Sequence, residues 1–159
     1  MIDPHKPKYF PLYWRMAYQA QYESVATREQ VGSVVVTTSG MLSIGWNGMP
    51  AGMPNACETY QHVPGEGRHR LKTNRAVIHA EQNALDKMLV QGIPTKNALL
   101  FVTLSPCFEC AKKLVGLGLK AIHYDRLHDC TEGLDLLKDV GVSVVSRDEN
   151  HTGQSLMLQ

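Results

Sequence analysis

The chain lacks the features that would place it in several large classes of protein. It has no run approaching the roughly 18 apolar residues of a membrane-spanning helix, and its first segment, MIDPHKPKYFPLYWR, has no apolar core of a secretion signal. It also lacks a surplus of either charge, with 16 Lys and Arg against 15 Asp and Glu. Wrapping a long nucleic-acid backbone requires many surplus cations. We therefore expect a cytoplasmic protein that binds neither membrane nor polynucleotide, although a few basic side chains in one pocket still allow a small anionic ligand.

Cysteine is scarce, with only Cys57, Cys107, Cys110 and Cys130 among the 159 residues. In a reducing cytoplasm such cysteines are metal ligands or core residues more often than disulfide partners. A chain of this length suggests one domain with its own core. We expect a single domain over residues 1–159, with a core over about residues 8–146 and a loose C-terminal tail.

Hydrophobic patterning predicts an α/β domain with a mixed sheet. A β-branched run over residues 31–38 turns at residues 39–40 into a second strand over residues 41–46, which is the pattern of a hairpin. Residues 47–75, rich in Gly, Pro and charge, are predicted as a long loop. Helices are predicted over residues 8–26, 77–92, 106–118 and 131–141, and further strands over residues 97–104, 120–125 and 142–146. This alternation indicates one antiparallel pair and parallel strands joined by helical crossovers.

Two motifs at predicted helix starts indicate a catalytic metal site. His79 and Glu81 open one helix, and the segment PCFEC opens the next with Cys107 and Cys110 three residues apart, on one helix face. One imidazole and two thiolates hold a tetrahedral Zn²⁺ and leave one position for water, which is typical of catalytic rather than structural zinc. Glu81 is then placed to take a proton from that water and pass it to a substrate. A structural zinc half-site and a redox pair are the alternatives, but no second C-x-x-C completes a four-cysteine site.

With these motifs the chain resembles the cytidine deaminase-like superfamily, and within it the deoxycytidylate (dCMP) deaminases. H-x-E followed by P-C-x-x-C is the signature of zinc deaminases. The matching stretches cover most of residues 12–145 and are ATREQVGSVVV, IGWNGMPAGMPNACE, HAEQNAL, TLSPCFECAKKLVGLGLK and LLKDVGVSVV. The resemblance implies a three-layer α/β/α fold with a five-stranded mixed sheet. It also implies hydrolysis of dCMP to dUMP and ammonia, which supplies thymidylate synthesis, with Glu81 as the proton carrier.

Candidate substrate-binding residues surround these motifs, and they are Asn47, Arg28, Ser24, Thr27, Ala80 and Tyr124. The resemblance assigns Asn47 to the sugar and the backbone N–H of Ala80 to the base carbonyl, whereas an Asn selected for its turn conformation is the alternative. The guanidinium of Arg28 has the donors to bind a 5′-phosphate, helped by Ser24 or Thr27, unless it only caps the preceding helix. Tyr124 is either a sugar or base contact or a core residue.

The resemblance also implies regulation and assembly. dCMP deaminases of this type are commonly activated by dCTP with Mg²⁺, inhibited by dTTP and assembled as homohexamers. The basic segment HVPGEGRHRLK is either an effector site or a solvated loop, and the candidate effector ligands are Trp46, Gly48, Arg68, Arg70 and Lys72. A second zinc site formed by Cys57, His62 and His69 is a further hypothesis. The chain departs from the family at two places. Trp46 stands where the family often has Tyr, and Leu127 and His128 stand where the family often has a Tyr after the fourth strand.

Two other functions remain open at this point. tRNA adenosine deaminases share both metal motifs, but the segment NGMPAGMP and the long insert up to Arg75 are similar to the dCMP deaminase pattern, and near-neutral charge suits a mononucleotide. A non-catalytic nucleotide-binding protein on the same fold is the second alternative. A protein that only binds would not need Glu81.

Overall fold

A five-stranded mixed sheet forms the centre of the protein, whose computed structural model describes residues 1–149. The strand order is β2-β1-β5-β6-β7, and the strands are β1 (Gly32–Val36), β2 (Leu42–Trp46), β5 (Leu99–Leu104), β6 (Ala121–Arg126) and β7 (Val144–Ser146). Both neighbours of β1 run antiparallel to it, whereas β5, β6 and β7 are mutually parallel. The mixed sheet and the hairpin predicted from the sequence are confirmed, but the expectation of one antiparallel pair is wrong, because β5 also runs antiparallel to β1.

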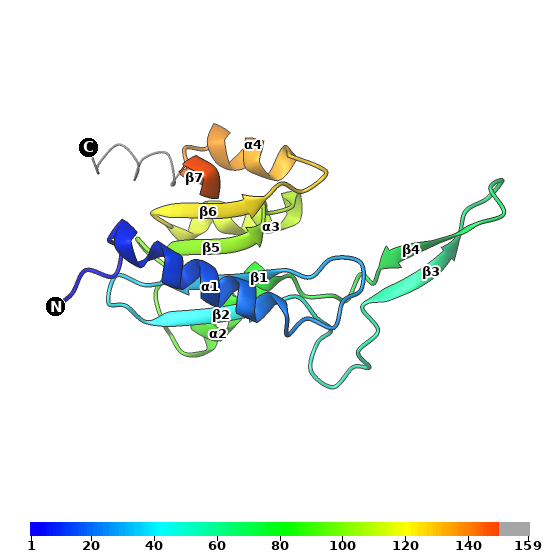
Figure 1. The fold of residues 1–159 in the computed structure, drawn as a ribbon, viewed down its shortest axis with the longest axis horizontal. Helices are drawn as coiled ribbons and strands as arrows, with labels where there is room; N and C mark the ends of the chain where they lie inside the picture. Colours follow the sequence, from blue (N-terminus) through cyan, green and yellow to red (C-terminus); the bar gives the residue numbers. More distant parts are fainter. Residues whose placement is uncertain (150–159) are drawn as a thin grey trace.

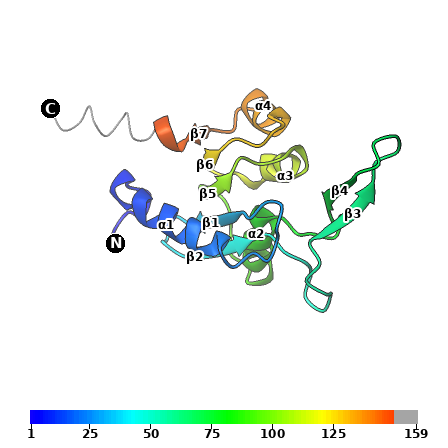
Figure 2. The ribbon, with the colours of Figure 1, turned by 45° about the vertical axis from the view of Figure 1, so that its right-hand side comes forward.

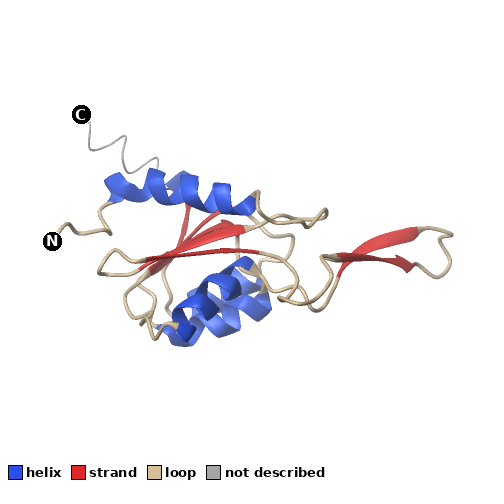
Figure 3. Cartoon of the chain, turned by 90° about the horizontal axis from the view of Figure 1, so that it is seen from below, coloured by secondary structure: helices blue, strands red, loops and turns tan. Residues whose placement is uncertain are grey.

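Helices cover both faces of this sheet, which gives three layers (Figure 3). One face carries α1 (Phe10–Gln21), which follows a short 3-10 turn at Pro7–Tyr9. The other face carries α2 (Ala80–Val90), α3 (Phe108–Leu114), the 3-10 turn Val115–Leu117 and α4 (Glu132–Asp139). The α/β/α architecture is therefore also confirmed.

The period-two alternation of strand residues divides the core into two clusters. On β1, Val35 faces α2, α3 and α4, whereas Val34 and Val36 face α1, and all three are fully buried. Phe101 on β5 packs edge-to-face against Trp14 of α1 with ring centroids 5.3 Å apart. Because both faces are covered, the inner strand β5 is a nearly continuous apolar run, which made it predictable from sequence.

A separate hairpin projects away from the body of the protein (Figures 1 and 2). It consists of β3 (Glu58–His62) and β4 (His69–Thr73), which pair antiparallel with each other and with no strand of the main sheet. We call residues 58–73 the arm. The prediction of a loop over residues 47–75 is wrong for this segment. Apart from Tyr60 and Leu71, which pair with each other, its strands carry only polar or charged residues, so they lack the apolar alternation by which a half-buried strand is recognised.

The first residue of the predicted C-terminal tail is held against the body of the protein. Arg147 forms an ion pair with Asp125 at 2.8 Å and lies over the ring of Trp14, so the predicted tail begins with an anchored residue. The remainder of that tail, from residue 150, lies outside the described residues. No helix in residues 1–149 is long and apolar enough to cross a membrane.

Candidate metal centre and adjoining cavity

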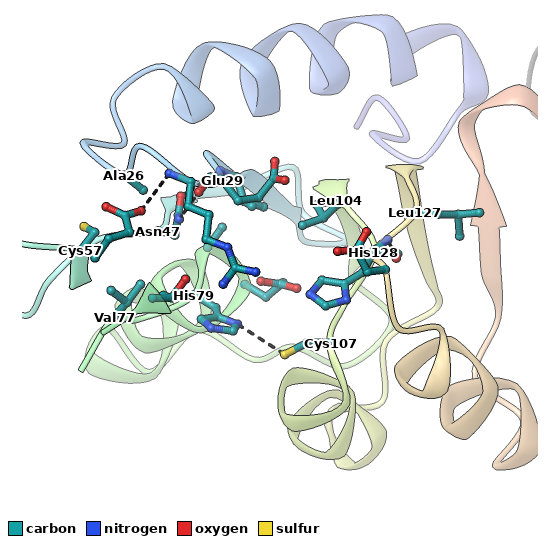
Figure 4. A pocket seen from close by; sticks show the side chains of 18 residues that line it. Ala26, Glu29, Asn47, Cys57, Val77, His79, Leu104, Cys107, Leu127 and His128 are labelled. Carbon is teal, nitrogen blue, oxygen red and sulfur yellow. Dashed lines mark hydrogen bonds between the residues drawn. The ribbon is translucent and has the colours of Figure 1, made fainter. Parts of the chain in front are cut away.

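Two helix N-termini bring the predicted metal ligands together. His79 is the N-cap residue of α2, Cys107 is the N-cap residue of α3, and Cys110 lies in the first turn of α3. His79 Nδ1 lies 3.5 Å from Cys107 Sγ and 3.3 Å from Cys110 Sγ, and all three ligand atoms lie within 4.8 Å of one another. Figure 4 marks the contact between His79 and Cys107.

This geometry fits zinc. With Zn–S bonds of about 2.3 Å and Zn–N bonds of about 2.0–2.1 Å, tetrahedral coordination places a nitrogen and a sulfur ligand about 3.6 Å apart. The two distances from His79 Nδ1 to the thiol sulfurs are close to this value. Two sulfur donors and one imidazole are also a typical zinc donor set, and three protein ligands leave a fourth position for water.

The ligands are tuned by their proximity. The contact with Cys110 Sγ, together with His79, lowers the pKa of the Cys107 thiol to about 3. The same contact with Cys107, with burial, raises the pKa of Cys110. The contact with Cys107 also raises the pKa of the His79 imidazole. Because thiolates rather than thiols bind a metal, metal binding at this cluster is coupled to the loss of thiol protons.

Glu81 lies beside this cluster on the first turn of α2. Its side chain is only 4% exposed, and burial raises the pKa of its carboxyl group to about 7. A carboxyl group with a pKa near neutrality can both accept and donate a proton under physiological conditions. Glu81 thus has the position and the acidity of a proton carrier next to the metal ligands.

Two glycines allow the close packing that fixes the two helix starts. A Cβ atom on Gly45 of β2 would lie 2.2 Å from the carbonyl oxygen of Ala80, next to His79. A Cβ atom on Gly133 of α4 would lie 2.3 Å from the carbonyl oxygen of Pro106 and 2.8 Å from the carbonyl carbon of Cys107. Only glycine permits these approaches, so strand β2 and helix α4 press directly against the ligand-bearing backbone.

A cavity of about 440 Å³ opens above the metal ligands (Figure 4). This volume lies within the range of about 300–1,000 Å³ that is typical of small-molecule sites. Its wall is formed by loops at the ends of the strands and by α2, and the lining residues are Ala26, Arg28, Glu29, Val31, Asn47, Cys57, Glu58, Thr73, Val77, His79, Ala80, Glu81, Leu104, Ser105, Cys107, Leu127, His128 and Asp129.

The structure brings three of the predicted substrate ligands, Arg28, Asn47 and Ala80, to this cavity. The guanidinium group of Arg28 forms no hydrogen bond or ion pair within the described part of the chain, although its backbone N–H donates to Glu58. The N–H of Ala80 is the first of helix α2 and, as expected at a helix start, has no backbone partner. Both groups are available to a ligand.

Asn47 has a structural role in addition to its place in the lining. Its Nδ2 donates to the carbonyl oxygen of Glu29 at 2.7 Å, and its Oδ1 accepts from the N–H of Val31 at 2.8 Å. An Asn side chain has two N–H donors and two acceptor lone pairs, so one of each is left for a ligand. The amide thus fixes the loop before β1 while retaining the capacity for a sugar contact.

The other predicted substrate ligands lie outside the lining. Ser24 is buried, and its hydroxyl donates to the carbonyl oxygen of Asn47 at 2.8 Å. The hydroxyl of Thr27 donates to Glu58 at 2.9 Å. Tyr124 lies within β6 and packs against the core cluster on the α2 side of the sheet. The structure therefore gives no support to direct contact between these three side chains and a ligand in this cavity.

The predicted effector residues are not among those that line the cavity, although Trp46 and Gly48 flank its residue Asn47 and Lys72 precedes its residue Thr73. Arg70 and Lys72 are exposed on β4, two residues apart and hence on one face of the arm, and Arg68 precedes them at 4.0 Å from Glu66. Trp46 lies on the edge strand β2 beneath the ammonium group of Lys87, and Gly48 pairs with Ile78. The hypothesis of a second zinc site with Cys57 is not supported, because His79, Cys107 and Cys110 form the only metal-ligand group found among residues 1–149.

His128 is a cavity residue that the sequence did not identify as a ligand. Its Nδ1 accepts the backbone N–H of Cys130 at 3.1 Å, so in the neutral ring the proton resides on Nε2. His128 therefore presents an N–H donor, and in Figure 4 its ring points into the cavity. The available signal was its place just after a predicted strand, where ligand-binding residues of parallel sheets gather.

The fold and the site together define a class of zinc-binding deaminase domain, and comparisons with known proteins agree. The family profile described as "Cytidine and deoxycytidylate deaminase zinc-binding region" matches residues 11–125. The chain belongs to this family. The dCMP deaminase of cyanophage S-TIM5, solved in complex with dCMP and dUMP, is 36% identical and superposes with a TM-score of 0.77 over 89% of this chain and 98% of that chain.

Two curated relatives are similar to most of this chain. The deoxycytidylate deaminase of Mus musculus is 32% identical over 130 residues, which are 79% of this chain and 68% of the mouse protein. ComE operon protein 2 of Bacillus subtilis is 30% identical over 140 residues, which are 82% of this chain and 69% of that protein.

Proposed function

We propose that this protein catalyses the hydrolytic deamination of dCMP to dUMP and ammonia. The observation that carries the proposal is the combination of a zinc-type His79–Cys107–Cys110 cluster with the buried carboxyl group of Glu81 at the floor of one cavity. The similarity to the cyanophage enzyme that was solved with dCMP and dUMP supports the choice of nucleotide.

The residues of the chain account for the proton transfers of this reaction. When bound, zinc polarises a water molecule and lowers its pKa, which supplies a nucleophile at neutral pH. Glu81 accepts the proton from the attacking water and delivers it to N3 of the cytosine ring. It then carries a second proton to the 4-amino group, which leaves as ammonia. A carboxyl pKa of about 7 suits a group that has to be both base and acid in one cycle.

Groups around the cavity account for recognition of the rest of the nucleotide. The N–H of Ala80 donates to the base carbonyl, and the spare amide donor and acceptor of Asn47 bind the sugar hydroxyl. The guanidinium of Arg28 binds the 5′-phosphate, for which its fork of donors is well suited. The Nε2–H of His128 is a second donor for the substrate. This arrangement favours a mononucleotide, because both ends of the molecule find partners within one cavity.

We also propose that dCTP with Mg²⁺ activates and dTTP inhibits the enzyme, which supplies dUMP for thymidylate synthesis in the cytoplasm. The exposed cations Arg68, Arg70 and Lys72 of the arm provide charge for a triphosphate, together with Trp46 and Gly48 near its base. Their absence from the cavity lining is consistent with a distinct effector site. A homohexamer is the assembly that the family resemblance implies, and packing of the arm against another subunit would stabilise an otherwise marginal two-stranded hairpin.

Ammonia release from dCMP, deoxycytidine, CTP and an RNA hairpin tests the proposal directly. We expect turnover of dCMP to exceed that of the other three substrates. Addition of dCTP with Mg²⁺, or of dTTP, to the dCMP reaction then tests regulation. Preference for the RNA hairpin would overturn the proposal in favour of a nucleic-acid deaminase. Binding of dCTP without turnover of dCMP at any effector concentration would instead indicate a non-catalytic nucleotide-binding protein.

A further inference from the structure

Glu58, at the base of the arm, is an acidic residue in the wall of a cavity that is proposed to hold a phosphate. Its carboxylate accepts three hydrogen bonds from two consecutive residues of a distant loop. Oε1 accepts the backbone N–H groups of Thr27 and Arg28, each at 3.0 Å, and Oε2 accepts the hydroxyl of Thr27 at 2.9 Å. An anion next to a phosphate site weakens phosphate binding unless it contributes something else.

The contacts show that Glu58 is ionised and engaged. Burial alone would raise the pKa of its carboxyl group, but the hydrogen bonds from Arg28 and Thr27 outweigh burial and lower this pKa. The carboxylate is therefore charged at neutral pH, and charge-assisted hydrogen bonds of this kind are stronger than neutral ones.

The same loop is also held from its other side. The carboxylate of Glu29 forms an ion pair with Arg126 of β6 at 2.6 Å, and the carbonyl oxygen of Glu29 accepts from Asn47. Between these anchors, Arg28 is bound only through its backbone, since its guanidinium has no hydrogen bond or ion pair within residues 1–149. The point at which this long side chain leaves the loop is thus set by a backbone that Glu58 fixes.

From this geometry we infer that Glu58 is a positioning residue, which holds Arg28 in place to bind the 5′-phosphate of the substrate and so makes the base of the arm part of the substrate-binding machinery. The inference rests on the proposed function. Glu58 acts through the loop rather than on the reacting atoms. Its loss therefore weakens phosphate recognition and leaves the chemical step intact.

The test compares Glu58→Ala with Glu58→Gln in steady-state kinetics without effectors. Both variants remove the charge, but Gln retains a carbonyl oxygen that can accept the two backbone N–H groups. We expect Glu58→Ala to raise KM for dCMP about tenfold, equivalent to 1.4 kcal/mol of binding, with kcat within about twofold of wild type. Glu58→Gln is expected to remain within about threefold of the wild-type KM, since it keeps the backbone contacts. Glu66→Ala, an exposed acid on the same arm, is the matched control and is expected to leave both constants unchanged.

Two further measurements separate positioning from a general structural effect. The kcat/KM for deoxycytidine, which has no phosphate, is expected to be unchanged in Glu58→Ala. In an Arg28→Ala background, Glu58→Ala is expected to have no additional effect on KM for dCMP, because both changes remove the same interaction. If Glu58→Ala does not fold, Thr27→Val removes one of the three hydrogen bonds and is expected to raise KM for dCMP about twofold to threefold.

The outcomes distinguish the two claims. If the wild type turns over dCMP but Glu58→Ala, or in its place Thr27→Val, has a wild-type KM, the role of Glu58 is wrong and the proposed function stands. Equal losses for dCMP and deoxycytidine, or additive effects with Arg28→Ala, also overturn the positioning role. Absence of dCMP turnover by the zinc-loaded wild type overturns the proposed function, and the role of Glu58 with it.

Discussion

His123 provides a pH-dependent stability that can be calculated from the structure. It lies on β6, is 4% exposed, and stacks on Phe101 with ring centroids 4.6 Å apart and planes 8° apart, while Phe10 packs against it edge-on at 4.9 Å. Burial lowers the pKa of its imidazole from 6.5 to about 4. The folded protein therefore binds the proton less readily than the unfolded chain does. Stability is lost as the pH falls from about 6.5 to about 4, because only the unfolded state gains the proton in this window.

The magnitude follows from proton linkage. With these two pKa values, the free energy of unfolding falls by about 2 kcal/mol between pH 7 and pH 5 through His123 alone. His123→Phe keeps a flat ring on Phe101 and removes the titration, so this part of the pH dependence disappears. Other groups, including the metal ligands, titrate alike in both proteins and cancel in the difference.

Urea denaturation at pH 7, 6 and 5, at one protein concentration and with zinc present, measures this difference. Between pH 7 and pH 5 the wild type is expected to lose about 2 kcal/mol more than His123→Phe does. The exposed His62→Phe on the arm serves as the control and is expected to follow the wild type. A difference between wild type and His123→Phe that stays constant across this pH range would refute the reasoning.

Three further predictions concern the metal centre. Glu81→Gln is expected to retain zinc and to lower kcat by about 10²–10⁴-fold, as measured by ammonia release and metal analysis; turnover at the wild-type rate would contradict the proton-carrier role. Chelation of the metal is expected to abolish turnover, which added Zn²⁺ restores in the wild type but not in Cys110→Ala. Gly133→Ala places a Cβ atom 2.3 Å from the carbonyl oxygen of Pro106 and is expected to cost about 1–3 kcal/mol of stability. It is also expected to lower the affinity for zinc, as measured by competition with a chelator. Gly116→Ala, with no atom within 4 Å of its added Cβ, is the control, and equal behaviour of the two glycine variants would show that α4 does not support the site.

The sequence predicted the body of the fold because burial there is repetitive. Strand β5 lies between covered faces and therefore appears as an apolar run, and Gly92 ends α2 with a positive φ of 65°. The first helix was predicted to reach residue 26 but ends at Gln21. Ser24 uses its hydroxyl to bind the backbone of Asn47 across the fold, a contact that local patterns do not encode.

The arm was missed for the opposite reason. Tyr60 is 75% exposed, its partner Leu71 is the one aliphatic residue of the two strands, and the other residues of β3 and β4 are charged or polar. Such strands give no alternation to detect, and only the positive φ angles at Gly65 and Gly67 mark the turn. Only the structure shows how β3 and β4 pair, with Glu58 opposite Thr73 and His62 opposite His69.

The site divides in the same way between local and long-range information. His79, Cys107 and Cys110 could be predicted because each motif is local and each starts a helix. The rim of the cavity, formed by the loop that carries Arg28, could not be predicted in this way. Asn47, Glu58 and Arg126 hold this loop, and they lie 18, 30 and 97 positions from the loop residues that they bind.

Substitutions in the metal motifs and substitutions around the Arg28 loop are therefore expected to have different kinetic effects. Changes in the local motifs remove the metal or the proton carrier, so they act on kcat. Changes in Asn47, Glu58 or Arg126 leave the metal and the proton carrier in place and alter the position of Arg28, so they act on KM for a phosphorylated substrate. Asn47 has two roles in binding, because its amide ties the loop that carries Arg28 and also lines the cavity. Substitution of Asn47 is therefore expected to weaken dCMP binding more than the loss of either role alone. The resulting rise in KM combines the lost sugar contact with the lost support of the loop that carries Arg28.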